Sequence, residues 1–235
     1  RETAHVELRG LYRRSPAGTL GCLAAGFANG AFWALAPVFT SWVSADSALA
    51  AWFMTAAVLG GAAAQWPLGL LSDRLGRRHV LTLVAVVAAI VGALLYGLSG
   101  HIGTVTICVL GALWGALAFP LYTIAVAHAN DYADPSEYVN VSSGLLLMYG
   151  IGATVGPFVA STMMTAISSR LLFGFSFAVH ALLAGFALYR YFVRSTPGDT
   201  PMEFGDAFAA TQTASPVYEE EIASDAEALR PGAGD

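Results

Sequence analysis

The stretch "GLLSDRLGRRHV", residues 69–80, places charged side chains between two long apolar runs. Asp73, Arg74, Arg77 and Arg78 fall within six residues, although only 11% of the chain is charged. Soluble domains carry about 25% charged residues. The low charge and the 56% of apolar residues therefore predict that lipid surrounds most of the surface. In that setting, the charged stretch is expected to form a tight turn at the membrane surface, between two spanning helices.

Six apolar runs are long enough to cross a membrane, because a spanning helix needs roughly 20 mostly apolar residues. The runs are 17–43, 47–71, 79–98, 103–127, 139–166 and 170–193. They lack the alternation of spanning strands, and a helix satisfies its own backbone groups in lipid. The sequence therefore predicts an all-α membrane protein with six transmembrane helices in a bundle over 17–194.

The segments outside this bundle differ from it in composition. Residues 1–16 are charged and are interpreted as a cytoplasmic linker. Residues 195–235 contain nine acidic residues and one Arg, whereas residues 1–194 contain ten Arg and seven acidic residues. The polar, acidic composition of 195–235 predicts a disordered cytoplasmic tail.

The positions of Arg predict how the bundle is oriented. If the helices alternate in direction, most Arg residues fall on one side of the membrane, before the first helix, between the second and third, and at the end of the sixth. Only Arg170 falls on the other side. Positively charged residues are enriched on the cytoplasmic side, so both termini are expected in the cytoplasm.

The charged stretch resembles the signature loop of the major facilitator superfamily, G-x-L-S-D-R-x-G-R-R. The matching residues are Gly69, Leu71, Ser72, Asp73, Arg74, Gly76, Arg77 and Arg78. The resemblance implies a transporter that works by alternating access. It also implies that this loop is a cytoplasmic conformational latch, in which Asp73 interacts with a helix end of the opposite half-bundle. Gly76 is expected to provide the positive φ that a tight turn needs.

A second match lies in the fifth helix, "GIGATVGPFVA". Gly152, Gly156 and Pro157 resemble the G-x-x-x-G-P element of the same superfamily. Glycines at this spacing allow close packing between helices, and the proline removes a backbone hydrogen bond and bends the helix. Two further pairs, Gly26 with Gly30 and Gly111 with Gly115, have the same spacing.

The superfamily normally has twelve helices in two six-helix repeats, and this chain supplies one repeat. The linker-like start and the polar tail favour the C-terminal half, with an N-terminal six-helix half as the expected partner. The stretch "AHANDYADPSEYVNVSSGLLLMYGIGATVGP" looks like the YcaD-type branch of the superfamily, whose members are bacterial inner-membrane proteins. A stand-alone half-size transporter that pairs with a copy of itself remains an alternative.

In this fold the first, second, fourth and fifth helices of each half line a central cavity. Polar or aromatic residues on these helices are candidates to line it: Asn29, Trp33, Gln65, Trp114 and Tyr122. Polar side chains are costly in lipid, so Asn29 and Gln65 should face the interior. His128 and Asp131, which end the fourth helix, are candidates for a cytoplasmic gate with the nearby Arg residues.

Other functional classes find little support. A rhomboid-like protease would need a G-x-S-G serine near a histidine, and "NVSSG" lacks the first glycine. The five His are scattered, with no i,i+4 pair, so we predict no metal, no cofactor and no enzymatic activity. The expected partners are the lipid bilayer and a small solute whose identity the sequence leaves open, and not nucleic acid.

Overall fold

The computed structural model describes residues 8–193, which form seven α-helices and one 3₁₀ turn. The elements are α1 (Leu8–Arg14), α2 (Pro16–Val43), α3 (Ala48–Leu75), α4 (Arg77–Leu98), α5 (Thr104–Asn130), η1 (Pro135–Glu137), α6 (Tyr138–Ala166) and α7 (Leu171–Val193). Six of them are long and apolar enough to cross a membrane. At 1.5 Å per residue, even α4 with 22 residues spans the roughly 30 Å of hydrocarbon in a bilayer.

The predicted spans are confirmed, but several of their ends differ. Helix α3 continues to Leu75 and α4 begins at Arg77, so the predicted loop shrinks to the single residue Gly76. Helix α5 continues to Asn130, three residues beyond the predicted run. The segment 1–16, predicted as a linker, contains the short helix α1. The predicted tail, 195–235, lies outside the described residues.

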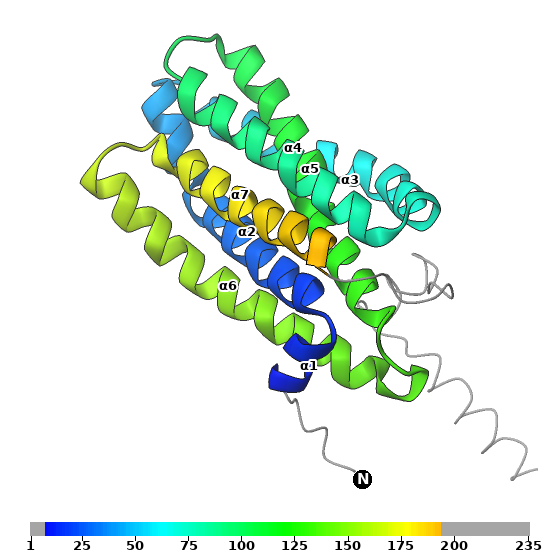
Figure 1. Ribbon diagram of the computed structural model, residues 1–235. Coiled ribbons are helices and arrows are strands. Elements are labelled where there is room, and N and C mark those ends of the chain that lie inside the picture. The colour runs from blue at the N-terminus through cyan, green and yellow to red at the C-terminus, as the bar shows by residue number, and fades with distance from the viewer. Residues whose placement is uncertain (1–7, 194–235) are drawn as a thin grey trace, which may run out of the picture.

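The six long helices form two rows. In one row α3 packs against α5, α5 against α2, and α2 against α6. In the other row α4 and α7 lie side by side and pack across α5 and α2, as Figure 1 shows. Successive helices alternate in direction, so α2 begins, α3 ends and α7 ends at the same end of the bundle. We call this the arginine-rich end, because Arg14, Arg74, Arg77, Arg78 and Arg190 lie there.

Glycines bring neighbouring helices of the first row into close contact. A Cβ on Gly30 would lie 2.6 Å from the Cα of Ala153, and a Cβ on Gly156 would lie 3.0 Å from the Cα of Phe27. On the other side, a Cβ on Gly111 would lie 2.5 Å from the Phe53 ring. The glycine pairs predicted to pack helices closely therefore form the α2–α6 and α3–α5 contacts.

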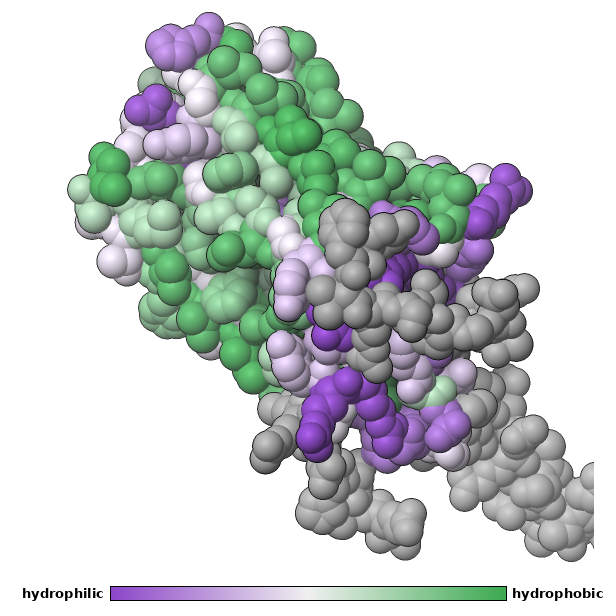
Figure 2. Space-filling model, in the orientation of Figure 1, coloured by the Kyte–Doolittle hydropathy of each residue, from purple (hydrophilic) through white to green (hydrophobic). Residues whose placement is uncertain are grey.

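The core between the two rows is rich in aromatic rings. Phe32 of α2 stacks on Trp114 of α5 with the ring centroids 4.8 Å apart, and Phe173 of α7 contacts Trp114 edge-on. Apolar side chains also cover the outside of the bundle, whereas hydrophilic residues gather mainly at the arginine-rich end (Figure 2). This distribution is typical of a protein whose sides face lipid.

Candidate functional site

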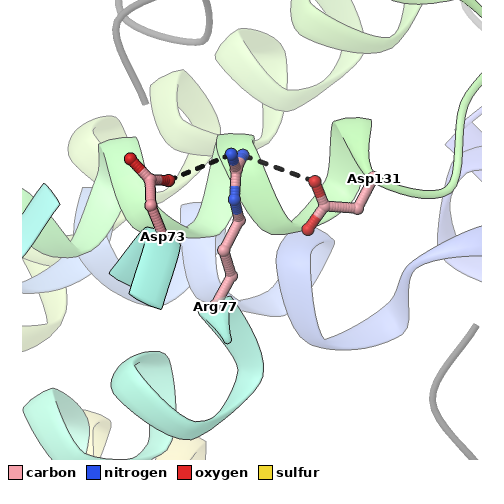
Figure 3. A network of polar contacts seen from close by, with 3 residues as sticks. All are labelled: Asp73, Arg77 and Asp131. Carbon is pink, nitrogen blue, oxygen red and sulfur yellow. Dashed lines mark hydrogen bonds and ion pairs between the residues drawn. The ribbon is translucent and has the colours of Figure 1, made fainter. Parts of the chain in front are cut away.

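The guanidinium of Arg77 lies between two carboxylates at the arginine-rich end (Figure 3). Its Nη2 donates a hydrogen bond to Oδ1 of Asp73 at 3.2 Å, and its Nη1 lies 3.4 Å from Oδ1 of Asp131. The Arg77 side chain is only 2% exposed, whereas those of Asp73 and Asp131 are 29% and 20% exposed. A buried cation needs such partners, because an isolated charge is costly to remove from water.

The sequence builds this network around one glycine. Gly76 has φ 85°, in the region that favours glycine, and it lets α3 end and α4 begin with one residue between them. Asp73 therefore lies in the last turn of α3, and Arg77 is the first residue of α4. The positive φ predicted for Gly76 is confirmed.

Each charge of this network sits at the helix end that disfavours it. Asp73 and the C-cap residue Asp131 lie at the negative ends of α3 and α5, and Arg77 lies at the positive end of α4. Helix dipoles disfavour these placements by about 0.3–1 kcal/mol each. The ion pairs offset that cost, so the three charges depend on one another.

The other residues of the signature stretch take different positions. Gly69 is buried in α3, and Arg74 is exposed. Arg78 donates a hydrogen bond to the backbone carbonyl of Arg190 at the end of α7. The predicted gate residue His128 is buried and packs edge-on against Tyr132, with the ring centroids 5.3 Å apart. Of the predicted gate pair, it is therefore Asp131 that pairs with an arginine.

A second ion pair at this end was not expected from the sequence. Arg14 pairs with Glu137, and this contact lowers the pKa of the Glu137 carboxyl below its usual range. Arg14 precedes α2 and Glu137 precedes α6. Because α2 and α6 run in the same direction side by side, the residues before them meet. No signal in the local sequence indicates this pair, because it depends on which helices lie side by side.

All five predicted cavity residues lie on helices of the row of α2, α3, α5 and α6. Trp33 is 49% exposed and stacks on Phe119 of α5, with the ring centroids 5.6 Å apart and the planes within 6°. Gln65 of α3 donates a hydrogen bond from Nε2 to Oγ1 of Thr123 at 3.0 Å. The ring of Tyr122 in α5 contacts the ring of Tyr149 in α6, with the centroids 4.8 Å apart.

Asn29 and Trp114 are the most deeply placed of these candidates. Asn29 is 4% exposed, and its Oδ1 has no hydrogen-bond partner among the described residues. Trp114 is fully buried and donates from Nε1 to Oγ of Ser176 at 2.9 Å. The expectation that Trp114 lines a cavity is wrong, because its ring fills the core between α5 and α7.

Comparison with known proteins decides the family. The sequence profile of the Major Facilitator Superfamily matches residues 18–220, which is most of the chain. The chain belongs to the major facilitator superfamily. A relative from Yersinia enterocolitica, named "Uncharacterized MFS-type transporter YE1530", is 29% identical over 189 residues, which cover 80% of this chain and 46% of the relative.

Two further superfamily relatives give the same result. One, from an Enterobacter strain and named "Uncharacterized MFS-type transporter Ent638_1421", is 33% identical over 68% of this chain and 41% of its own length. The other, from Escherichia coli and named "Uncharacterized MFS-type transporter YcaD", is 32% identical over the same shares. The chain thus spans less than half the length of these relatives.

The superfamily and the six spanning helices together define the setting of the site. Such a chain is an integral inner-membrane protein, and its relatives point to a transporter and not to an enzyme. The second sequence match to the superfamily, the G-x-x-x-G-P element, lies in α6. Its Gly152 and Gly156 are buried against α2, and its Pro157 lies inside the helix.

Proposed function

We propose that this chain is one six-helix half of a secondary active transporter, which moves a small solute across the inner membrane by alternating access. Superfamily membership supports this function. The chain spans 41–46% of relatives that are named as transporters, which supports an N-terminal six-helix half as its partner. The row α3–α5–α2–α6 is the face that meets the partner, and α4 and α7 are peripheral.

The network of Asp73, Arg77 and Asp131 is the conformational latch of this transporter. One observation carries the proposal: the buried Arg77 joins carboxylates from the ends of two helices, α3 and α5, which both belong to the cavity row. The network carries a net negative charge, and Asp73 is partly exposed. That exposed charge suits a contact with the positive end of a helix in the other half.

The solute path runs over the same row, past Trp33. This side chain lies near the middle of α2 and is half exposed, and its ring stacks on Phe119. Gln65 and Tyr122 lie on the same four helices and provide partly exposed polar groups at membrane depth. We assign the arginine-rich end to the cytoplasm, in accordance with the positive-inside rule.

Cysteine accessibility tests alternating access without knowledge of the solute. In cells that express the transporter containing this chain, Trp33→Cys is expected to react with a membrane-impermeant maleimide offered from either side. Leu182→Cys is the matched control, because Leu182 is also in mid-helix and is 75% exposed, but on the peripheral helix α7. We expect Leu182→Cys to be protected by lipid from both sides.

Two outcomes would contradict the proposal. Trp33→Cys could be protected from both sides, which would mean that no water-filled path passes this face of α2. Alternatively, Leu182→Cys could react as fast as Trp33→Cys, which would mean that the water-accessible face is not the row of α2, α3, α5 and α6.

A further inference from the structure

Four aromatic rings form a continuous strip across the row of α2, α5 and α6. Trp33 of α2 stacks on Phe119 of α5, and Tyr122 of α5 contacts Tyr149 of α6. Phe119 and Tyr122 are three residues apart in one helix and therefore lie on neighbouring turns of the same face. All four side chains are at least partly exposed, so the strip is a surface against which a ligand can pack.

A buried amide lies on the same face of α2 as this strip. Asn29 comes four residues before Trp33. It also comes three residues after Gly26, whose backbone lies against that of Tyr149. On the opposite side of α2, Leu20 faces α7, and the nine residues from Leu20 to Asn29 make about two and a half turns. Asn29 therefore points away from α7, toward the face of the row that carries the rings.

The oxygen of this amide has no partner in the part of the chain that the structure describes. Asn29 is only 4% exposed, and its Oδ1 accepts no hydrogen bond there. Buried polar groups are normally hydrogen-bonded, and an unmade bond in a buried site costs free energy. A donor on a molecule that packs against this face of α2 would supply the missing bond.

The helices of the same row offer no charge at this depth. Their spans contain no Asp, Glu, Lys, Arg or His over 16–43, 48–72, 104–127 and 138–166. An ion is costly to remove from water unless an opposite charge compensates it. A ligand group that contacts this half at membrane depth is therefore favoured when it is uncharged, and the aromatic strip favours another ring.

We infer that the solute carries an uncharged aromatic ring with an O–H or N–H donor, as phenols and indoles do. The ring packs on the strip that begins at Trp33, and the donor bonds to Oδ1 of Asn29. This inference rests on the proposed function, because it takes the row of α2, α3, α5 and α6 as the solute path, and it adds the chemical class of the solute.

The experiment uses the transporter that contains this chain, purified in a neutral detergent. Affinities come from the saturable rise of the melting temperature with ligand concentration. The first probe is 2-naphthol, and each matched probe changes one property. In 2-methoxynaphthalene the donor is absent, and in decahydro-2-naphthol the aromatic ring is absent. At pH 7, 2-naphthoate carries a negative charge and 2-naphthylmethylamine a positive charge.

The variants are Trp33→Leu and Asn29→Leu, and the control is Trp66→Leu. Trp66 is 71% exposed but lies on another side of α3 from the strip. It is five residues, or about 140° around the helix, from Gly61, which meets Phe119. The melting temperature without ligand shows whether each variant is folded.

We expect 2-naphthol to bind, and the probes without the donor or without the aromatic ring to bind about three- to tenfold more weakly. The two charged probes should bind most weakly. Trp33→Leu should weaken 2-naphthol about three- to tenfold. Asn29→Leu should abolish the preference for 2-naphthol over 2-methoxynaphthalene, and Trp66→Leu should change each affinity less than about twofold.

Three results with these probes would overturn the inference. A charged probe could bind more tightly than 2-naphthol, Asn29→Leu could keep the full preference for 2-naphthol, or Trp66→Leu could weaken binding as much as Trp33→Leu. The inference also fails, with the proposed function intact, if no probe gives saturable stabilisation while Trp33→Cys is labelled from both sides. Protection of Trp33→Cys from both sides would contradict the proposed function, and this inference with it.

Discussion

At the scale of single residues, Arg77 is buried although its two partners, Asp73 and Asp131, are partly exposed. Its position at the first residue of α4 is electrostatically unfavourable by itself, and so are the positions of Asp73 and Asp131 at the ends of α3 and α5. The three residues therefore stabilise the bundle only while they remain together. This mutual dependence supports the proposal that the network acts as a conformational latch.

Removal of the cation should leave two carboxylates close together without the guanidinium that lies between them. We expect Arg77→Gln to lower the free energy of unfolding by about 1–3 kcal/mol, less than the 3–5 kcal/mol of a fully buried pair because both aspartates reach water. Arg74→Gln is the matched control, since Arg74 is exposed and lies one turn earlier. Thermal melting in detergent measures the stability of both variants. Equal melting temperatures for Arg77→Gln and Arg74→Gln would argue that the ion pairs of Arg77 do not stabilise the bundle.

The pairing of Glu137 with Arg14 predicts a dependence on pH. The pKa of Glu137 is lowered in the folded protein by the hydrogen bond from Arg14. Its contribution to stability is therefore complete above the usual value of 4.5 and is lost as the pH falls through the lowered folded value. The melting temperatures of the native chain and Glu137→Gln should differ near pH 7 and converge only well below the usual carboxyl pKa of 4.5. A difference that grows on acidification would show the opposite sign.

At the scale of elements, glycines set how closely the helices approach. Gly156 lies against the backbone of Phe27, whereas a Cβ on Gly150, in the same helix, would meet nothing within 4 Å. We expect Gly156→Val to separate α2 from α6 and to cost about 1–3 kcal/mol, as overpacking does. The control Gly150→Val introduces the same side chain without a clash.

Thermal melting and elution from a sizing column compare the two glycine variants. The expected result is a lower melting temperature for Gly156→Val alone. If Gly150→Val destabilises the bundle as much, the effect would come from valine in a helix, and the close contact between α2 and α6 would not limit packing.

The sequence predicts the elements better than it predicts their contacts. Lipid requires long apolar helices, so the six spans and the packing glycines can be read from composition and spacing. Helix ends are harder, because Asp73 and Arg74 look like loop residues but belong to α3. Trp114 was misplaced because a tryptophan on a helix face gives no indication of which neighbour covers it. The pair of Arg14 and Glu137 depends on which helices are adjacent, and local sequence does not specify that.

At the scale of the whole molecule, the arrangement in two rows and the Arg distribution predict the orientation. Gly103, before α5, lies at the end opposite the arginine-rich end, and a Cβ there meets nothing within 4 Å. In intact cells, an impermeant maleimide should label Gly103→Cys, whereas Arg74→Cys should react only after the membrane is opened. The native Cys22 is buried, and the partly exposed Cys108 is replaced by Ser in both variants to remove its background. The reverse labelling pattern would place the arginine-rich end outside the cell.

We propose that the Asp73–Arg77–Asp131 network holds one state of an alternating-access cycle. The most direct measurement is the labelling rate of Trp33→Cys from each side of the membrane, with and without Asp73→Asn, in the transporter that contains this chain. We expect Asp73→Asn to speed labelling from the cytoplasmic side and to slow it from the outside, whereas Arg74→Gln should change either rate less. Labelling rates that Asp73→Asn leaves unchanged on both sides would contradict the latch role of this network.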